Sequence, residues 1–259
     1  MTVATSRAAS PTIPPTQPDG PWVMDGEKGE CILQRNYKID KSVLTMALIS
    51  DPYDDDFTLI LVGKDLPLGR ASGHLALLPD GRDVNIHTVG DKLANGRRAE
   101  TVMPEKADPP KLQRNLNTVT ITIGRFRWSL ATPKFDQALK ALTECDRMLI
   151  QSWGLDPDER AHIATPVEME SDKAWLKSSD YPNRALLEGV QGNTRILFTV
   201  NIDGHVTDCR VVISSGNKQL DDTVCSHLIA RGHFTPAQDA AGHPVAAHET
   251  STIAWRVGL

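Results

Sequence analysis

The sequence predicts an α+β protein: a β-rich N-terminal domain closed by one helix, then a smaller domain of order α-β-β-α-β with a three-stranded antiparallel sheet. Three observations predict this class. Short segments rich in Val, Ile and Thr, separated by turn residues, fill the first half; a long amphipathic stretch follows; helical and strand patterns alternate in the last third. The 259 residues suffice for two domains. We expect a disordered Pro-rich tail at 1–20, the first domain at 21–155, a linker at 156–172 and the second domain at 173–259.

The predicted strands of the first domain are short apolar segments bounded by turn signals such as Asp25-Gly26 and Asp80-Gly81. Thr118–Ile123 alternates polar and apolar residues, as a strand with one wet face does. The expected strands are Glu30–Lys38, Ser42–Ser50, Phe57–Val62, His74–Leu78, Val84–Val89, Thr118–Ile123 and Arg127–Ala131.

A helix is predicted next, because apolar residues recur at helical spacing between Phe135 and Trp153. Thr132 can cap its N-terminus, Pro133 suits its first turn, and Gly154 can end it. Such a helix should pack its apolar stripe on the preceding sheet.

The second domain shows two helical and three strand patterns. Asn201–Gly204 is a tight hairpin signal between two of the strands. The expected elements are a short helix Pro182–Leu187, strands Thr194–Asn201 and His205–Ser214, a helix through Leu220, Val224 and Leu228 ending at Gly232, and a last strand His248–Val257.

Charge and hydropathy exclude several classes of protein. The formal net charge of −5 gives no basic face for nucleic acid. No run of about 18 apolar residues is present, so no membrane-spanning helix is expected in this chain. The N-terminus lacks the apolar core of a signal peptide. The protein is therefore either cytosolic or exported, with its signal peptide or anchor absent from this chain.

Four cysteines, Cys31, Cys145, Cys209 and Cys225, lie outside any CxxC motif, which argues against a zinc ribbon or a thioredoxin-type site. Four cysteines allow three pairings. Cys31–Cys145 with Cys209–Cys225 is preferred because each pair then stays within one domain, and two structural disulfides would indicate an oxidising compartment. Four buried free thiols in a cytosolic protein are the alternative.

No constellation of residues indicates catalysis, a metal or a cofactor. None of the eight histidines is arranged as a HExxH site. The acidic run Asp51–Asp56 lacks the Gly and distal Glu of a calcium loop and is interpreted as a solvated loop. Ser214 and Ser215 do not lie in a G-x-S-x-G elbow. We therefore expect a binding protein and not an enzyme.

The last third of the chain carries an ordered set of motifs that resembles a known family. The set is Tyr181-Pro182-x-x-Ala185, Gly189, Gly192, Phe198–Val206, Ser214–Gly216, Leu220-Asp221, Phe234–Ala237 and Gly242–Val245. Their order and spacing over about residues 173–257 resemble the TonB C-terminal domain. The resemblance does not extend to the N-terminal domain, which no motif assigns.

The resemblance implies a periplasmic protein that recognises the TonB box of outer-membrane receptors, or a related envelope protein, by adding an extended peptide to a sheet edge. The matching edge is His248–Val257, with Tyr181 and Pro182 beside it; packing of the first helix is the alternative role for that pair. The Cys209/Cys225 pair resembles a variant of this domain found in some exported proteins. The implied partner-binding residues are Tyr181, Pro182, His248, Thr250, Thr252, Ala254 and Arg256.

The chain also departs from a full energy transducer, which has an N-terminal membrane helix and a long Pro-rich spacer. A soluble adaptor or sensor therefore fits the sequence better. The alternative function is structural: the same edge forms a homodimer or docks the first domain, and any ligand or activity belongs to the N-terminal β domain.

Overall fold

The structure is a computed structural model that describes residues 14–26, 29–53, 57–79, 82–104, 112–169 and 174–257. The chain divides into two compact units. The first comprises Met1–Asp25, Cys31–Ser50 and Asp55–Glu144, and the second Gly26–Glu30, Asp51–Asp54 and Cys145–Leu259. The predicted helix is confirmed as α1, Phe135–Ser152, and the division between the units falls inside it and not at residue 155.

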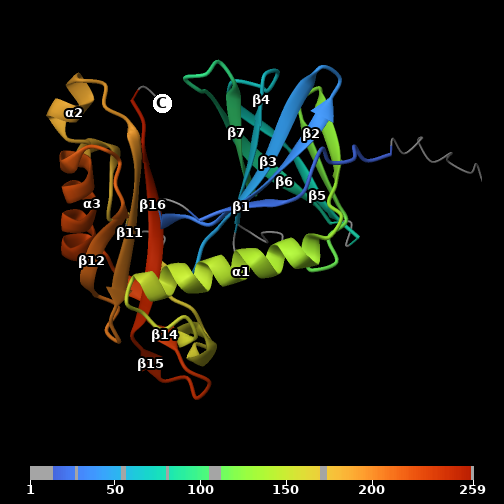
Figure 1. Cartoon of the computed structure of the whole chain (residues 1–259). Coiled ribbons are helices and arrows are strands. Elements are labelled where there is room, and N and C mark those ends of the chain that lie inside the picture. The colour runs from blue at the N-terminus through green and yellow to red at the C-terminus, as the bar shows by residue number, and fades with distance from the viewer. Residues whose placement is uncertain are drawn as a thin grey trace, which may run out of the picture. The chain divides into compact units, whose positions relative to one another are not determined.

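A nine-stranded sheet forms the first unit, with strands in the order β1-β2-β3-β4-β7-β6-β5-β8-β9 (Figure 1). Every neighbouring pair is antiparallel. The strands are β1 (Val23–Asp25), β2 (Ile32–Ile39), β3 (Ser42–Ser50), β4 (Phe57–Gly63), β5 (Gly69–Leu78), β6 (Arg82–Lys92), β7 (Arg98–Pro104), β8 (Thr118–Ile123) and β9 (Phe126–Ala131).

The N-terminal segment joins the two ends of this sheet. Thr16 donates its backbone N–H to Ser129 of β9 at 2.7 Å and accepts from Ala131, while Asp19 donates to Asn36 of β2 at 2.8 Å. The expectation of a disordered tail is therefore wrong for residues 16–19, and residues 1–13 lie outside the described residues. The outer strands of an open sheet leave backbone groups unpaired, and even a Pro-rich segment can supply a few partners for them.

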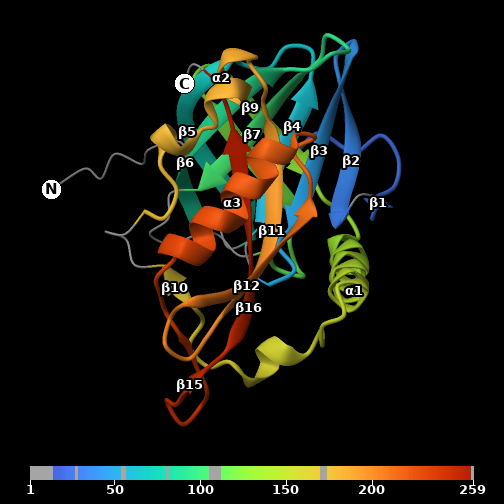
Figure 2. The same cartoon turned by 90° about the vertical axis from the view of Figure 1, so that its left-hand side faces the viewer.

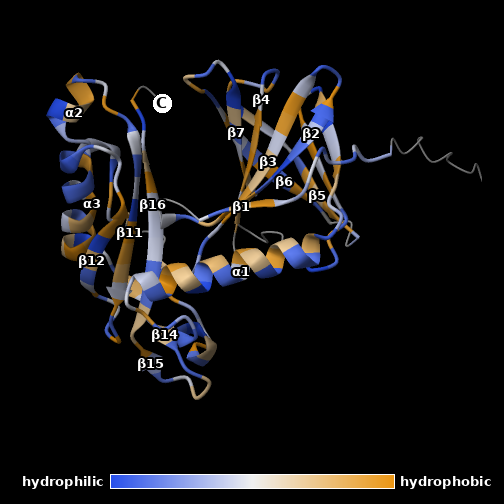
Figure 3. Ribbon diagram, viewed as in Figure 1, coloured by the Kyte–Doolittle hydropathy of each residue, from blue (hydrophilic) through white to orange (hydrophobic). Residues whose placement is uncertain are grey.

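Two strands of this sheet, β1 and β7, were not predicted. The polar residues Arg98, Glu100 and Thr101 obscure the β pattern of β7, yet Glu100 is fully buried. The start of α1 packs in this unit. Phe135 is buried with its ring 5.6 Å from that of Trp22. Figure 3 shows apolar residues recurring along α1.

The second unit is built on a three-stranded antiparallel sheet of order β12-β11-β16. Helix α3 lies over one face of it in both views (Figures 1 and 2). The main elements are α2 (Asn183–Leu187), β11 (Gly192–Val200), β12 (Val206–Ile213), α3 (Lys218–Arg231) and β16 (Ala247–Trp255). Six short elements are added: η2 (Glu159–His162), β10 (Glu168–Met169), η3 (Ser178–Asp180), β13 (Phe234–Thr235), β14 (Ala237–Gln238) and β15 (Pro244–Val245).

The described part of the predicted linker 156–172 is ordered within this unit. It contains η2 and β10. Gln238 donates its backbone N–H to Thr165 at 2.9 Å and accepts from Ala164 at 2.8 Å. The polar, acidic composition of the segment indicated solvent exposure, but these backbone bonds hold it in place.

Alternate residues of β11 divide the core of the second unit. Ile196, Phe198 and Val200 pack with Leu220, Val224 and Leu228 of α3, as β-strand periodicity requires. Leu197 points to the other face, where it packs with Tyr53 and Ile150. Both faces of the central strand are therefore covered.

Candidate functional site

The strand β16 is the candidate functional site because its edge is open. Among the described residues it pairs with β11 along its whole length, from Ala247↔Val200 to Trp255↔Gly192, and with no strand on its other side. The strand at the opposite edge, β12, is partly covered by the chain itself. A methyl group placed on Gly29 would lie 3.4 Å from the carbonyl oxygen of Val212, near the end of β12. An unpaired edge is a template for pairing with another strand.

The side chains of β16 alternate between the two faces of the sheet. Register with β11 places Ala247, Glu249, Ser251, Ile253 and Trp255 on the α3 face, which we call the helix face. His248, Thr250, Thr252 and Ala254 lie on the far face. Four of the seven residues implied by the resemblance thus share one face of the edge strand.

The other three lie at the end of this strand. The hydroxyl of Tyr181 donates to the carbonyl of Val190, and its ring meets the Trp255 ring edge-on at 5.0 Å. Pro182 precedes α2 as its N-cap residue. These contacts are those of the packing alternative. Arg256 turns back and donates to the carbonyl oxygens of Gly192 at 3.1 Å and Trp255 at 2.9 Å.

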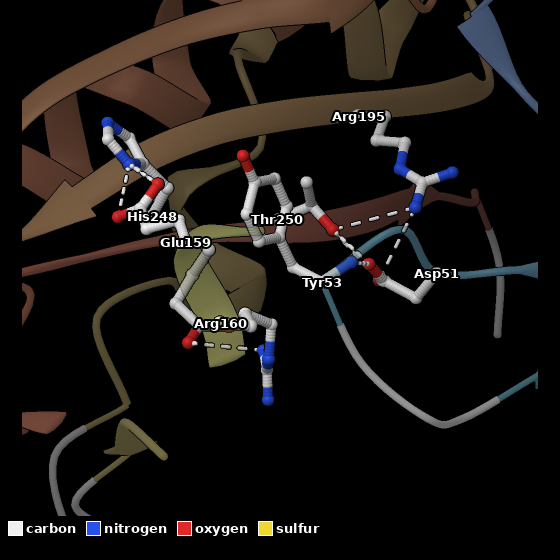
Figure 4. A network of polar contacts seen from close by, with 8 residues as sticks. Asp51, Tyr53, Glu159, Arg160, Arg195, His248 and Thr250 are labelled. Carbon is white, nitrogen blue, oxygen red and sulfur yellow. Dashed lines mark hydrogen bonds and ion pairs between the residues drawn. The ribbon is translucent and has the colours of Figure 1, made fainter. Parts of the chain in front are cut away.

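A polar cluster covers the far face at the first half of β16 (Figure 4). Thr250 donates its hydroxyl to the Asp51 carboxylate at 2.6 Å, and the guanidinium of Arg195 lies 3.4 Å from the same carboxylate. On the other side of Tyr53, His248 Nδ1 lies 2.7 Å from the Glu159 carboxylate. Two predicted partner-binding residues are therefore already engaged within the unit.

Sequence reasoning missed Asp51, Tyr53 and Glu159. The interpretation of Asp51–Asp56 as a solvated loop is wrong for its first residues: Tyr53 is 2% exposed and its ring lies parallel to that of Trp153. Burial raises the pKa of Tyr53, and the nearby carboxylate of Glu159 raises it further, so the phenol stays neutral. In the sequence, the signal for a packed turn was Pro52 followed directly by the aromatic residue Tyr53.

The other end of the sheet is organised by the buried carboxylate of Asp221 on α3. It accepts hydrogen bonds from the hydroxyls of Thr194 at 2.8 Å and Ser214 at 2.5 Å, and from the backbone and hydroxyl of Ser215. Burial alone would raise the pKa of Asp221, but these bonds outweigh burial and lower the pKa. Ser214 and Ser215, which lie outside any nucleophile elbow, both bond this carboxylate.

A disulfide bond is a second link between the sheet and helix α3. The predicted bond between Cys209 of β12 and Cys225 of α3 is present, with a Cα–Cα distance of 5.5 Å. Cys31 and Cys145 are also disulfide-bonded, and none of the four cysteines is free. The prediction of two disulfides is confirmed.

The described part of the chain carries neither a cluster of metal-ligating side chains nor a membrane-spanning helix. No group of three or more His, Cys, Asp or Glu side chains there could hold a metal ion. Among the same residues, no helix combines the length and the apolar character needed to cross a bilayer.

These features define a small α+β domain with an open sheet edge. By sequence this domain is of the TonB type: residues 177–257 match the family model of the Gram-negative bacterial TonB protein C-terminal. Protein TonB from two strains of Helicobacter pylori is 31% and 29% identical over 75 residues, which are 29% of this chain. The match covers only 27% and 26% of those relatives. The resemblance inferred from the motifs is confirmed for this segment.

One solved structure also matches part of this chain. The solution NMR structure of the Pseudomonas aeruginosa TonB CTD is 22% identical, covers 36% of this chain and 88% of that chain, and superposes with a TM-score of 0.29.

Proposed function

We propose that this chain is an exported binding protein, not an enzyme, which recognises TonB-dependent outer-membrane receptors or related envelope proteins. Recognition uses β-strand addition: an extended peptide of the partner pairs with the open edge of β16. The observation that carries this proposal is that β16, in a domain of the TonB type, pairs on one side only among the described residues. No cofactor is required.

The two disulfides support the proposed location. Structural disulfides persist in oxidising compartments such as the periplasm, and all four cysteines of this chain are disulfide-bonded. In this proposal the backbone of β16 supplies hydrogen bonds. The far-face side chains supply selectivity, and Tyr181, Pro182 and Arg256 shape the end of the strand.

Titration of the isotope-labelled full chain with TonB-box peptides tests this function. We expect saturable amide shifts on β16 and its neighbour β11. The matched control is the same peptide with N-methylated backbone amides, which keeps every side chain but cannot pair as a strand; it should cause no shifts. Absence of shifts with unmodified peptides at millimolar concentration would refute receptor recognition.

The same open edge favours one second candidate, self-association through β16. Sedimentation of the full chain over a wide concentration range separates the two functions. A mass that stays that of one chain supports partner binding, and a doubling that peptide reverses supports a homodimer through this edge.

A further inference from the structure

The short helix η2 contacts two consecutive residues of the open edge strand. The Glu159 carboxylate lies 2.7 Å from His248 Nδ1, and the Arg160 guanidinium lies 3.8 Å from the Glu249 carboxylate. His248 belongs to the far face of the sheet and Glu249 to the helix face. Neighbouring residues of one helix can reach both faces at the same point of a strand only from beside that strand. We infer that η2 lies along the edge of β16 at residues 248–249.

Contacts on both sides hold η2 in this place. Before it, Arg147 of α1 makes a two-pronged ion pair with Asp158, at 2.6 and 3.1 Å. After it, Ala164 and Thr165 hydrogen-bond to Gln238 of β14. The two contacts between η2 and β16 are also partly withdrawn from solvent, because the side chains of Glu159 and Glu249 are 25% and 19% exposed. An ion pair that is partly withdrawn from water is screened less than a surface pair. The contacts before and after η2 therefore fix its position.

Among the described residues, no helix makes such contacts with the second half of β16. Thr252 and Ala254 are exposed on the far face, and Ser251 and Ile253 are half-buried on the helix face. In the described structure no side-chain hydrogen bond or ion pair engages these four residues, and none of them carries a charge. Asp51, which bonds Thr250, marks the end of the covered half.

We propose that η2 confines strand addition to Ser251–Trp255. The fitting partner is a short extended peptide with uncharged side chains opposite Thr252 and Ala254, whose pairing stops where η2 begins. His248 then belongs to the internal contact with η2 and does not touch the partner. This proposal rests on the proposed function, and it defines the length and chemistry of the peptide. Covering part of an edge is a general means of preventing unwanted pairing.

A peptide-length series on the full chain tests the proposal. The probes are TonB-box peptides and the same peptides extended at either end by several residues. With the unaltered chain, extension should leave affinity unchanged, and the shifts on β16 should stay within Ser251–Trp255. In the double variant Glu159→Ala/Arg160→Ala, extension at one end should tighten binding roughly tenfold, equivalent to about 1.4 kcal/mol, and shifts should reach His248.

The matched control removes an exposed ion pair elsewhere: Lys218→Ala/Asp222→Ala on α3. It should behave as the unaltered chain does. Tighter binding of extended peptides to the unaltered chain, or no gain in the Glu159/Arg160 variant, would overturn the proposal.

Amide exchange without peptide separates this proposal from the proposed function. Amides of Ala247–Glu249 that are not bonded to β11 should exchange slowly in the unaltered chain and fast in the Glu159/Arg160 variant. The corresponding amides of Ser251–Trp255 should exchange fast in both. If no peptide binds, the receptor function fails while this result still decides whether η2 covers the edge. Equal exchange of the two halves in the unaltered chain would refute the cover.

Discussion

Two buried carboxyl groups, one in each unit, have opposite surroundings. Asp221 in the second unit is 9% exposed and accepts hydrogen bonds from three residues. Glu100 in the first unit is 0% exposed, and within the described structure neither of its oxygens makes a hydrogen bond. Burial costs a charge its hydration unless fixed dipoles replace the water. The partners of Asp221 therefore favour its anionic form, whereas the burial of Glu100 favours its neutral form.

The pKa values of these two groups are shifted in opposite directions. Hydrogen bonds outweigh burial and lower the pKa of Asp221. Burial raises the pKa of Glu100, and the nearby Thr88 hydroxyl opposes this rise only in part. The two groups should consequently respond to pH and to neutralisation in opposite directions. Asp221 also matters for the proposed function. It joins helix α3 to the sheet, and that sheet carries the open edge.

The largest effect is expected from Asp221→Ala. It leaves the hydroxyls of Thr194, Ser214 and Ser215 without their acceptor, and since each unsatisfied buried donor costs about 1–3 kcal/mol, about 4 kcal/mol should be lost in all. Urea unfolding followed by the indole NMR signals of Trp175 and Trp255 measures it, since both rings lie in this core. Asp222→Ala, one residue along the same helix and exposed, is the control and should cost far less. Equal losses for both variants would contradict the role of Asp221.

The pH dependence of that loss follows from the lowered pKa. A depressed pKa contributes stability above the ordinary value of 3.8, and this stability disappears as pH falls through the lower folded-state value. The difference between the native chain and Asp221→Asn should therefore be constant near neutral pH and shrink in acid. A difference that grows on acidification would contradict the assignment.

A covalent link between the same elements should matter slightly less. Replacing Cys209 and Cys225 by Ser removes the bond between β12 and α3, whose partners are separated by 16 positions. The chain-entropy model gives about 3 kcal/mol for a loop of this size. The same indole signals report the midpoint shift, and retained peptide shifts on β16 would show that the fold survives. A loss below 1 kcal/mol would mean that the disulfide adds little to the core packing and the Asp221 bonds that hold the helix.

Glu100→Gln should instead stabilise the first unit. A raised pKa means that stability is complete below the ordinary value of 4.5 and falls as pH rises through the folded-state value. Gln imitates the neutral acid, so the variant should match the native chain in acid and gain on the order of 1 kcal/mol at neutral pH. Unfolding followed at Trp22 and Trp128 tests this, with exposed Asp65→Asn as control. Destabilisation at neutral pH would indicate that the charged form has a partner.

Glu100 also explains why strand β7 could not be predicted from the sequence. A charged residue in a strand pattern indicates a solvent-facing position, so β7 was overlooked; its register beside Leu61 and Gly90 places Glu100 on the buried face. The second unit was more predictable because Asn201–Gly204 and the spacing of Leu220, Val224 and Leu228 are local signals. Asp51 and Glu159 could not be found in this way, since their contacts with β16 join residues 199 and 89 positions apart.

The smallest effect concerns Asp51, a third carboxylate, which is more exposed than the other two, with 32% of its side chain accessible to solvent. Thr250→Val removes the hydroxyl that bonds it and keeps the shape, so about 1 kcal/mol should be lost. Thr252→Val is the control, because it makes the same change two residues along the same face, where the side chain is exposed. If both variants unfold at the native urea midpoint, the Asp51 bond adds no stability. If only Thr250→Val is weakened, this carboxylate holds the edge strand in place from a part of the chain far outside residues 177–257.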